Sequence, residues 1–369
     1  MIRSQRLIQS FCRLTAIDSP SFGERQMADY LTGRLREMGF AVTEDDAGRR
    51  SHGTAGNLFA TLPGAGEPLL FSGHMDTVEP ARGKKAVCHE DGTITSDGTT
   101  VLGADDAAGL AVLLEAVASL REDGSAHRPL ELLISIAEEP YDRGSELFDF
   151  SRVRAREGYV LDLDGAVGRA AYAAPSICEF TVEITGRSAH AGFAPEKGIH
   201  AIAAAAKAIA ALPIGRVDSE TTCNIGRIEG GTAANIVPDR CLVRGELRSY
   251  SHETARRVFD SVSSVFARAA AEVGAVSRVQ SRFGCRAYAV PTDDPVVCRY
   301  QAACRENGVE PQLIRTFGGS DANQLSQHGV CCIVIANAMF RPHTCQEYTT
   351  GKDLTKAAEI VQSLMRSRQ

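Results

Sequence analysis

The 369-residue sequence lacks tryptophan, a long hydrophobic run and any surplus of basic residues. Its longest apolar window, GVCCIVIANAMF, is far shorter than the roughly 20 residues that a membrane-spanning helix requires. The formal net charge of -6 argues against nucleic acid or an anionic membrane as a partner, because either would require a basic face. A composition of 44% hydrophobic and 23% charged residues is typical of a soluble globular protein.

A disulfide framework is also missing from the sequence. The eleven cysteines are an odd number, they form no C-x-x-C pair, and only Cys331 and Cys332 are adjacent. Free thiols in a reducing compartment explain this usage better than paired cysteines do. The first 20 residues carry polar side chains throughout, so we expect a helix there and no signal peptide. We therefore expect a cytoplasmic protein.

The length and the alternation of strand and helix patterns predict two domains. The segment SFGERQMADYLTGRLREMGF opens with Ser21-x-x-Glu24, a capping-box pattern, and continues with apolar residues at helical spacing. Strand patterns follow in EPLLFSGHMDTV, LELLISIA and GYVLDLD, and the helical pattern AAGLAVLLEAVASLRED follows the first of them. Strands that alternate with helices predict an α/β domain with a mostly parallel sheet flanked by helices.

The pattern changes near residue 175. In EFTVEITGR and RCLVRGELRS apolar and polar residues alternate, which predicts strands with one wet face. Helical patterns lie between and after these strands, and VCCIVIAN then returns to the buried-strand pattern. We therefore expect a smaller α+β domain with an antiparallel sheet at 176–286. It interrupts a first domain that comprises 1–175 and 287–369.

Polar residues gather where the strands of the first domain are predicted to end, the edge at which open α/β sheets bind ligands. His74 and Asp76 lie two positions apart and therefore point to the same face of a strand. Asp105 and Asp106 precede an apolar helix, where Asp106 has the alternative role of a helix N-cap. His343 follows the last apolar strand.

The stretch LELLISIAEEP is the least expected of these strand ends. Five of its first seven residues are leucine or isoleucine, yet Glu138 and Glu139 follow directly after Ala137. Both glutamates are solvated if the strand stops at Ala137. If they are buried instead, other groups must compensate their charge, because an unpaired buried charge costs several kcal/mol.

Clusters of carboxylates and histidines on separate strand ends need a cation to limit their mutual repulsion. Two histidines with several carboxylates suit zinc, cobalt or manganese better than calcium or magnesium, which prefer oxygen ligands alone. A carboxylate beside a histidine can also orient the imidazole toward a metal. The residue types therefore favour a transition-metal site.

In this order, the motifs SGHMDTV, LGADDAAG, AEEP, GYVLDLDG and PHTCQEY resemble those of the two-zinc exopeptidases and amidohydrolases. That family includes peptidase T, glutamate carboxypeptidase and aminoacylase, and LGADD with Y-x-L-D is most similar to its peptidase T-like members. The resemblance spans most of the chain. It implies two Zn²⁺ ions per subunit, with Co²⁺ or Mn²⁺ as alternatives, a smaller lid and dimerisation domain, and a homodimer.

Position by position, the resemblance implies two metal sites that share one ligand. Asp105 bridges the two ions. His74 and Asp162 complete one site, and Glu139 and His343 complete the other.

The resemblance also implies two catalytic roles. Asp76 orients the first histidine ligand, and Glu138 is the general base and acid that acts on a metal-bound water. The family pattern Y-x-L-D favours Asp162 over Asp164 as the ligand. A cis peptide bond is implied at Asp105–Asp106.

Further motifs resemble the substrate-binding segments of the family. GRSAHAGFAPEKGIHAI contains His190, which would polarise the substrate carbonyl. GGTAANIVPDR and GELRS supply Asn235 and Arg248 for a substrate carboxylate, although a solvated surface arginine remains the alternative for Arg248. FGGSDAN supplies Gly319 and Ser320, where small residues allow close backbone approach.

We therefore expect a zinc-dependent exopeptidase that hydrolyses short peptides, as a peptidase T-like aminopeptidase does. One alternative is an N-acyl amino acid amidohydrolase or carboxypeptidase of the same family. Another is a non-catalytic metal-binding homologue. The presence of Glu138 beside all five implied ligands argues against the last, because a decayed enzyme has no reason to retain the base.

Overall fold

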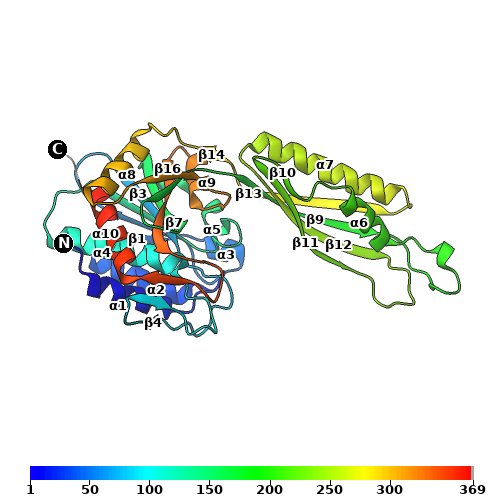
Figure 1. The fold of residues 1–369 in the computed structure, drawn as a ribbon, viewed down its shortest axis with the longest axis horizontal. Helices are drawn as coiled ribbons and strands as arrows, with labels where there is room; N and C mark the ends of the chain where they lie inside the picture. Colours follow the sequence, from blue (N-terminus) through cyan, green and yellow to red (C-terminus); the bar gives the residue numbers. More distant parts are fainter. Residues whose placement is uncertain (367–369) are drawn as a thin grey trace. The chain divides into compact units, whose positions relative to one another are not determined.

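The computed structural model describes residues 1–366. The chain forms two compact units: the first joins Met1–Ala173 to the segment from Ala289 onward, and the second is Ala174–Tyr288. The first unit has a main sheet whose central strands are parallel, and the second has a separate antiparallel sheet (Figure 1). The expected fold class is confirmed. Among residues 1–366, every helix is too short or too polar to cross a bilayer.

The main sheet has the strand order β1-β2-β6-β3-β7-β16-β8-β14, and β15 also pairs with β8. Neighbours β6, β3, β7 and β16 run parallel, whereas β1, β2 and β6 pair antiparallel. The strands are β1 (Ala41–Glu44), β2 (Leu58–Leu62), β3 (Leu69–His74), β6 (Leu130–Ser135), β7 (Glu157–Asp164), β8 (Arg169–Ala174), β14 (Tyr288–Ala289), β15 (Gln312–Arg315) and β16 (Cys331–Met339). A small sheet joins β17 (Tyr348–Thr350), β5 (Thr93–Thr95) and β4 (Val87–Cys88).

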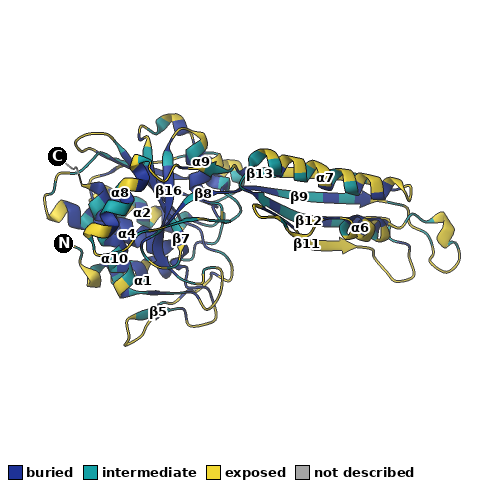
Figure 2. Cartoon of the chain, turned by 45° about the horizontal axis from the view of Figure 1, so that its top comes forward, coloured by how far each residue is buried: buried dark blue, intermediate teal, exposed yellow. Residues whose placement is uncertain are grey.

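The central strands β3 and β6 are buried along their whole length. Their sequences LLFSGH and LELLIS are almost continuously apolar, as strands covered on both faces require. Glu131 is the charged exception, and its carboxylate accepts hydrogen bonds from the backbone N–H groups of Arg154 and Ala155 at 3.1 and 3.0 Å. The core of the first unit therefore lies around these strands, and Figure 2 shows the same burial in β7 and β16.

Helices α1, α4 and α10 pack against one another beside the sheet (Figure 1). Helix α4 is buried on almost every side because ADDAAGLAVLLEAVASLRE is apolar around most of its circumference. The helices of this unit are α1 (Ser4–Thr15), α2 (Arg25–Glu37), α3 (Ala47–Ser51), α4 (Ala104–Glu122), α5 (Arg143–Glu146), η1 (Phe150–Arg152), α8 (Pro295–Glu306), α9 (Asp321–Gln327) and α10 (Gly351–Met365).

The second unit is an antiparallel sheet with two helices packed on one face. Its order is β10-β11-β12-β9-β13, and α6 contacts α7 on the face where Phe180, Val182 and Ile184 are buried. The opposite face carries the alternating polar residues of β9, as the period-two pattern predicted. The elements are β9 (Ser176–Thr185), η2 (Pro195–Lys197), α6 (Ala201–Ala210), β10 (Gly215–Asp218), β11 (Thr221–Gly230), β12 (Arg240–Ser249), α7 (His252–Ala271) and β13 (Val276–Cys285).

Candidate metal centre

The implied metal ligands meet at the carboxyl edge of the parallel strands. His74 is the last residue of β3, Glu139 follows the end of β6, and Asp162 lies near the end of β7. His343 follows β16, and Asp105 lies in the first turn of α4. Because β6, β3, β7 and β16 are parallel neighbours, their carboxyl ends bring these side chains together.

The first group of ligands is buried. Nε2 of His74 lies 3.0 Å from Oδ1 of Asp105 and 3.9 Å from Oδ1 of Asp162. The side chains of these three residues are 1%, 9% and 10% exposed. Nδ1 of His74 lies 3.0 Å from the backbone oxygen of Asp76 and 3.5 Å from its Oδ1. The imidazole is therefore held from one side and presents Nε2 to the two aspartates.

The second group shares Asp105 with the first. Nε2 of His343 lies 3.1 Å from Oδ2 of Asp105 and 3.0 Å from Oε2 of Glu139. In each group, the three candidate ligand atoms lie within 4.8 Å of one another. One carboxylate therefore directs one oxygen to each histidine. His343 is the most exposed of the five, at 54% of its side chain.

The charges of the two groups are coupled through Asp105. Burial raises the pKa of Asp162, and the neighbouring Asp105 raises it further. Burial also raises the pKa of Glu139, again with a contribution from Asp105. Hydrogen bonds to Asp105 and Glu139 raise the pKa of His343 to about 10. These shifts show that the cluster favours added positive charge, which a cation supplies more effectively than a proton.

The donor set fits two transition-metal ions. Each group offers one imidazole nitrogen and carboxylate oxygens from two acids, the mixture that zinc, cobalt and manganese accept. Oε1 of Glu139 is buried and has no hydrogen-bond partner among residues 1–366, so ligation there would break no existing bond. Burial alone would raise the pKa of Asp105, but hydrogen bonds from His343 and His74 outweigh it and hold that pKa below its usual range. The shared carboxylate is thus in the ionised state that a bridging ligand needs.

Asp76 connects the first histidine with the loop that carries both glutamates. Its Oδ1 accepts the backbone N–H of Glu138 at 2.9 Å, and its Oδ2 accepts that of Glu139 at 3.3 Å. Asp76 also lies beside the ring of His74 through Oδ1 and its backbone oxygen. One carboxylate therefore fixes the ligand on β3 relative to the loop after β6.

Glu138 belongs to neither group of candidate ligands among the described residues, although it follows the same strand as Glu139. Only 8% of Glu138 is exposed, so the solvated alternative for this glutamate is excluded. Burial raises the pKa of Glu138, and the charge of Asp162 raises it further. A buried carboxyl with a raised pKa beside a cluster of candidate ligands is suited to hold a proton more readily than an ordinary glutamate does.

The capping-box interpretation of Ser21-x-x-Glu24 is wrong. Helix α2 begins at Arg25 without a side-chain cap. Ser21 instead donates its hydroxyl to Oδ2 of Asp76 at 2.7 Å. Oε1 of Glu24 accepts the backbone N–H groups of Phe22 and Ala137 at 2.7 and 3.0 Å. Sequence reasoning missed both roles because the partners lie far away along the chain.

The segment that holds Asp105 also has a support that the sequence did not reveal. Glu347 is buried, and its two oxygens accept the backbone N–H groups of Gly103 and Asp105 at 2.7 and 2.9 Å. Burial, with a contribution from the charge of Asp105, raises the pKa of Glu347 to about 7. The peptide bond Asp105–Asp106 is cis, as the resemblance implied. The motif PHTCQEY thus contains Glu347, which holds the backbone at Asp105, as well as the implied ligand His343.

The implied substrate residues fall into three places. Ser320 is buried and caps α9, with its Oγ accepting the N–H of Ala322 at 3.4 Å, and Gly319 precedes it. His190 and Asn235 are exposed neighbours in the second unit, connected through the hydrogen bond from Ala191 N–H to the oxygen of Asn235 at 2.9 Å.

Arg248 lies at the opposite end of the second sheet from these two residues. It pairs in register with Ile177 at the start of β9, whereas the segment with Asn235 precedes Arg240 at the other end of β12. At about 3.3 Å per residue, the eight steps from Arg240 to Arg248 span roughly 26 Å. The Arg248 guanidinium makes a hydrogen bond to Oε1 of Glu246 at 2.9 Å, so it is not a simply solvated arginine.

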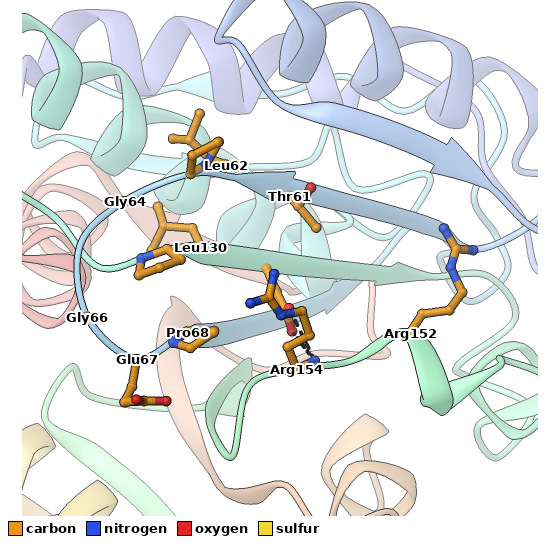
Figure 3. Close-up of a pocket in the computed structure, with 12 residues that line it drawn as sticks. Thr61, Leu62, Gly64, Gly66, Glu67, Pro68, Leu130, Arg152 and Arg154 are labelled. Carbon is orange, nitrogen blue, oxygen red and sulfur yellow. Dashed lines mark hydrogen bonds between the residues drawn. The ribbon is translucent and has the colours of Figure 1, made fainter.

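A cavity of about 490 Å³ lies at the other edge of the main sheet, where β3 and β6 begin (Figure 3). Figure 3 shows Arg152 and Arg154 on the segment that faces these strands, with Glu67 on the opposite loop. The lining residues include arginines and glutamates and contain no histidine. The metal-ligand mixture is therefore found at the carboxyl edge and is not repeated in this cavity.

Two family models match the chain. The model of the peptidase dimerisation domain matches residues 172–274. The model of peptidase family M28 matches residues 57–174. Together the two matches cover parts of both units and extend across the first boundary between them.

Similar proteins match nearly the whole chain. An uncharacterised protein of Bacillus subtilis, YqjE, is 38% identical over 367 residues, which are 99% of each chain. The crystal structure of aminopeptidase PepT from Bacillus cereus is 39% identical with a TM-score of 0.89 and covers 99% of this chain and 98% of its own. A tripeptidase from Staphylococcus aureus is 33% identical with a TM-score of 0.94 and the same coverage.

Proposed function

The chain belongs to the peptidase T-like family of metallopeptidases, and on that premise we propose that it is an aminopeptidase that hydrolyses short peptides with two metal ions. The two similar crystal structures, of an aminopeptidase and of a tripeptidase, support this reaction and substrate size. The observation that carries the proposal is the shared carboxylate of Asp105, whose two oxygens face His74 and His343 at 3.0 and 3.1 Å.

In the proposed centre, His74, Asp105 and Asp162 would hold one ion, and Asp105, Glu139 and His343 would hold the other, preferably Zn²⁺ in both places. When bound, two divalent cations would make a water molecule more acidic and would polarise the scissile carbonyl.

Glu138 acts as the general base and acid in this proposal. Its carboxylate takes a proton from the attacking water and delivers it to the nitrogen of the leaving peptide. Its buried position and the upward direction of its pKa shift support the first step, because a raised pKa makes the carboxylate a better proton acceptor. Asp76 is a positioning residue, since it contacts His74 and holds the backbone N–H of Glu138.

We also propose that the substrate is contacted by residues of both units. Gly319 and Ser320 offer a backbone segment near α9, and Ser320 owes its fixed conformation to the helix cap. His190 and Asn235 would contact the substrate from one end of the second unit, and Arg248 from the other.

These positions support a homodimer. About 26 Å of strand separates the level of Asn235 from that of Arg248, a distance longer than a tripeptide, whose extended length is about 10 Å. If both residues bind one short substrate, they must come from different subunits. The match of residues 172–274 to the peptidase dimerisation domain supports the same assembly. A cytoplasmic location is proposed as well, and the eleven free thiols are compatible with a reducing compartment.

The proposal is tested with a panel of dipeptides, tripeptides and N-acyl amino acids, assayed with added Zn²⁺ or Co²⁺. We expect metal-dependent release of N-terminal residues by the wild-type protein. Glu138→Gln should lose a factor of roughly 10² to 10⁴ in kcat while it keeps its bound metal. Glu90→Gln, a change of an exposed glutamate in the turn between β4 and β5, is the matched control and should retain full activity.

Other outcomes would redirect or refute the proposal. Cleavage confined to N-acyl or C-terminal substrates would retain the metal centre and identify an amidohydrolase or carboxypeptidase. Full activity of Glu138→Gln would show that another group is the base. A metal-replete protein that cleaves nothing in the panel would support a non-catalytic homologue.

A further inference from the structure

Asp106, the residue after the proposed bridging ligand, is buried and accepts three hydrogen bonds from different elements. Its Oδ2 accepts the backbone N–H of His74 at 3.1 Å. Its Oδ1 accepts the backbone N–H of Gly109 at 3.1 Å and the side-chain amide of Asn337 at 2.7 Å. The bond to Gly109 is the expected N-cap contact for the regular part of α4. The other two connect β3 and β16 to this helix.

Two glycines leave the space that the Asp106 carboxylate fills. A Cβ atom on Gly73 would lie 2.3 Å from Oδ2 of Asp106. A Cβ atom on Gly109 would lie 2.2 Å from Oδ1 of Asp106 and 2.7 Å from the oxygen of Leu161. Neither glycine has the positive φ that would otherwise explain its presence. The close packing of β3, α4 and β7 around the Asp106 carboxylate therefore requires glycine at positions 73 and 109.

Asn337 extends the connection to a fourth element. It lies in β16, is fully buried, and donates its side-chain amide to the oxygen of Leu161 at 3.0 Å as well as to Asp106. Its Oδ1 accepts the backbone N–H of Met339, the last residue of β16, at 3.1 Å. Asn337 thus connects the residue before Asp162 with the end of the strand that leads to His343.

We propose that Asp106 and Asn337 form a positioning pair that sets the spacing between the two metal sites. The pair connects the elements that carry His74, Asp105 and Asp162 with the strand that precedes His343, and neither member belongs to the groups of candidate ligands among the described residues. This inference rests on the two-metal centre proposed above. In this inference, the distance between the two metal sites is set by two side chains that contact the backbone next to the candidate ligands.

The hydrogen-bond pattern explains why these residue types are required. Three N–H donors point at Asp106, so both of its oxygens must be acceptors. An asparagine at 106 would direct its own amide hydrogens at one of these donors, whichever way it is oriented. Asn337 must donate to two oxygens and accept from one N–H, which a side-chain amide can do and a carboxylate cannot.

The test compares Asn337→Ala with Asn307→Ala in the full-length protein. Asn307 also donates its side-chain amide to two oxygens, those of Ala303 and Ser363, but it connects α8 with α10 away from the ligands. Co²⁺ is titrated into each metal-free protein, and its visible absorption reports the affinity and geometry of each site. Metal content after dialysis, kcat and KM are measured in parallel.

We expect wild type and Asn307→Ala to bind two Co²⁺ ions with the same spectrum. Asn337→Ala should bind Co²⁺ 10- to 100-fold more weakly, the usual effect of losing a group that orients metal ligands. Its spectrum should change, and kcat should fall more than KM rises. Asn337→Ser, which keeps one donor, should lie between the two.

Equal Co²⁺ affinity and equal spectra for wild type and Asn337→Ala would overturn the inference and leave the metal centre intact. If Asn337→Ala does not fold, Asn337→Ser decides by the same measurements. Failure of both variants to fold would make Asn337 a residue of general stability and would also overturn the inference. A wild-type protein that binds no ion would refute the proposed function, and this inference with it.

Discussion

Glu138 and Glu139 are adjacent in the chain but have different surroundings. Glu139 contacts His343, whereas the N–H of Glu138 is held by Asp76 and its carboxyl lies near Asp162. Ala137, just before them, has a φ of 44°, a left-handed conformation that is rare for alanine. Glu24 accepts the N–H of Ala137 and so stabilises the turn that leads into the two glutamates.

Glu24 should make stability depend on pH. Burial, with a contribution from Asp76, raises its pKa from 4.5 to about 7. A raised folded-state pKa gives stability that is fully present below the unfolded value and is lost as the pH rises through 7. Glu24→Gln removes this titration. Between pH 4.5 and 8, the free energy of unfolding of wild type should therefore fall relative to Glu24→Gln by about 3 kcal/mol.

Urea unfolding at several pH values measures this difference. The experiment uses excess chelator, because metal binding has a pH dependence of its own. Glu90→Gln should follow the wild-type curve, since Glu90 is exposed. Parallel curves for wild type and Glu24→Gln would show that Glu24 does not titrate in this range.

The two aspartates of GYVLDLDG should differ in their effect on metal binding. Asp162 lies among the candidate ligands, whereas Asp164 is exposed at the end of β7. Asp162→Ala should lose one of two bound ions and most activity, and Asp164→Ala should retain both ions. Metal analysis after dialysis measures this. The reverse result would move the ligand to Asp164.

At the scale of elements, four of the five candidate ligands lie at or just beyond the ends of parallel strands, and polar contacts between elements hold these strand ends in place. Asp321 in α9 is one such contact, because its Oδ2 accepts the hydroxyls of Ser72 in β3 and Ser135 in β6 at 2.9 and 2.7 Å. The start of α9, which follows the proposed substrate segment, is thereby attached to both strands. Burial raises the pKa of Asp321, and the hydrogen bonds from Ser72 and Ser135 act in the opposite direction.

Replacing a glycine with alanine should have opposite effects on the free energy of unfolding at two positions, Gly33 and Gly73. Gly33 lies in the middle of α2, is exposed, and would place a Cβ atom with nothing within 4 Å. Gly33→Ala should therefore raise the free energy of unfolding by about 0.5–1 kcal/mol through helix propensity. Gly73→Ala, whose Cβ would meet Asp106, should lower it. Chemical denaturation of both variants measures the two signs, and an unchanged Gly33→Ala would contradict the propensity argument.

At the scale of the whole molecule, the proposed assembly predicts a dimer. Sedimentation should give twice the chain mass of 39.4 kDa across a wide range of concentrations. We also expect Asn235→Ala and Arg248→Ala, each inactive toward a substrate with a free carboxylate, to regain part of their activity when mixed and allowed to exchange subunits. A monomer mass at every concentration, or no recovery on mixing, would argue against sites built from two subunits.

The sequence by itself determined the fold class. The change from continuous apolar strands to alternating ones near residue 175 reflects a change in burial from two faces to one, which is a local property of each strand. The histidines and carboxylates at predicted strand ends favoured a metal site, because such groups are costly to bury without a cation. Which of them are candidate ligands was implied by the resemblance of the motifs to the two-zinc exopeptidases and amidohydrolases. The structure brings these side chains together as two groups around Asp105.

Only the tertiary structure decided which residues besides Asp76 support the candidate centre. Ser21 and Glu24 match a capping box locally, yet their partners are Asp76 and Ala137, 55 and 113 residues away. Asn337 contacts Asp106 across 231 residues. A hydrogen bond depends on distance and direction in space, whereas a sequence pattern records only spacing along the chain. For this reason the motifs pointed to the candidate ligands and to Asp76, whereas the contacts of Glu24, Glu347 and Asn337 emerged only from the folded structure.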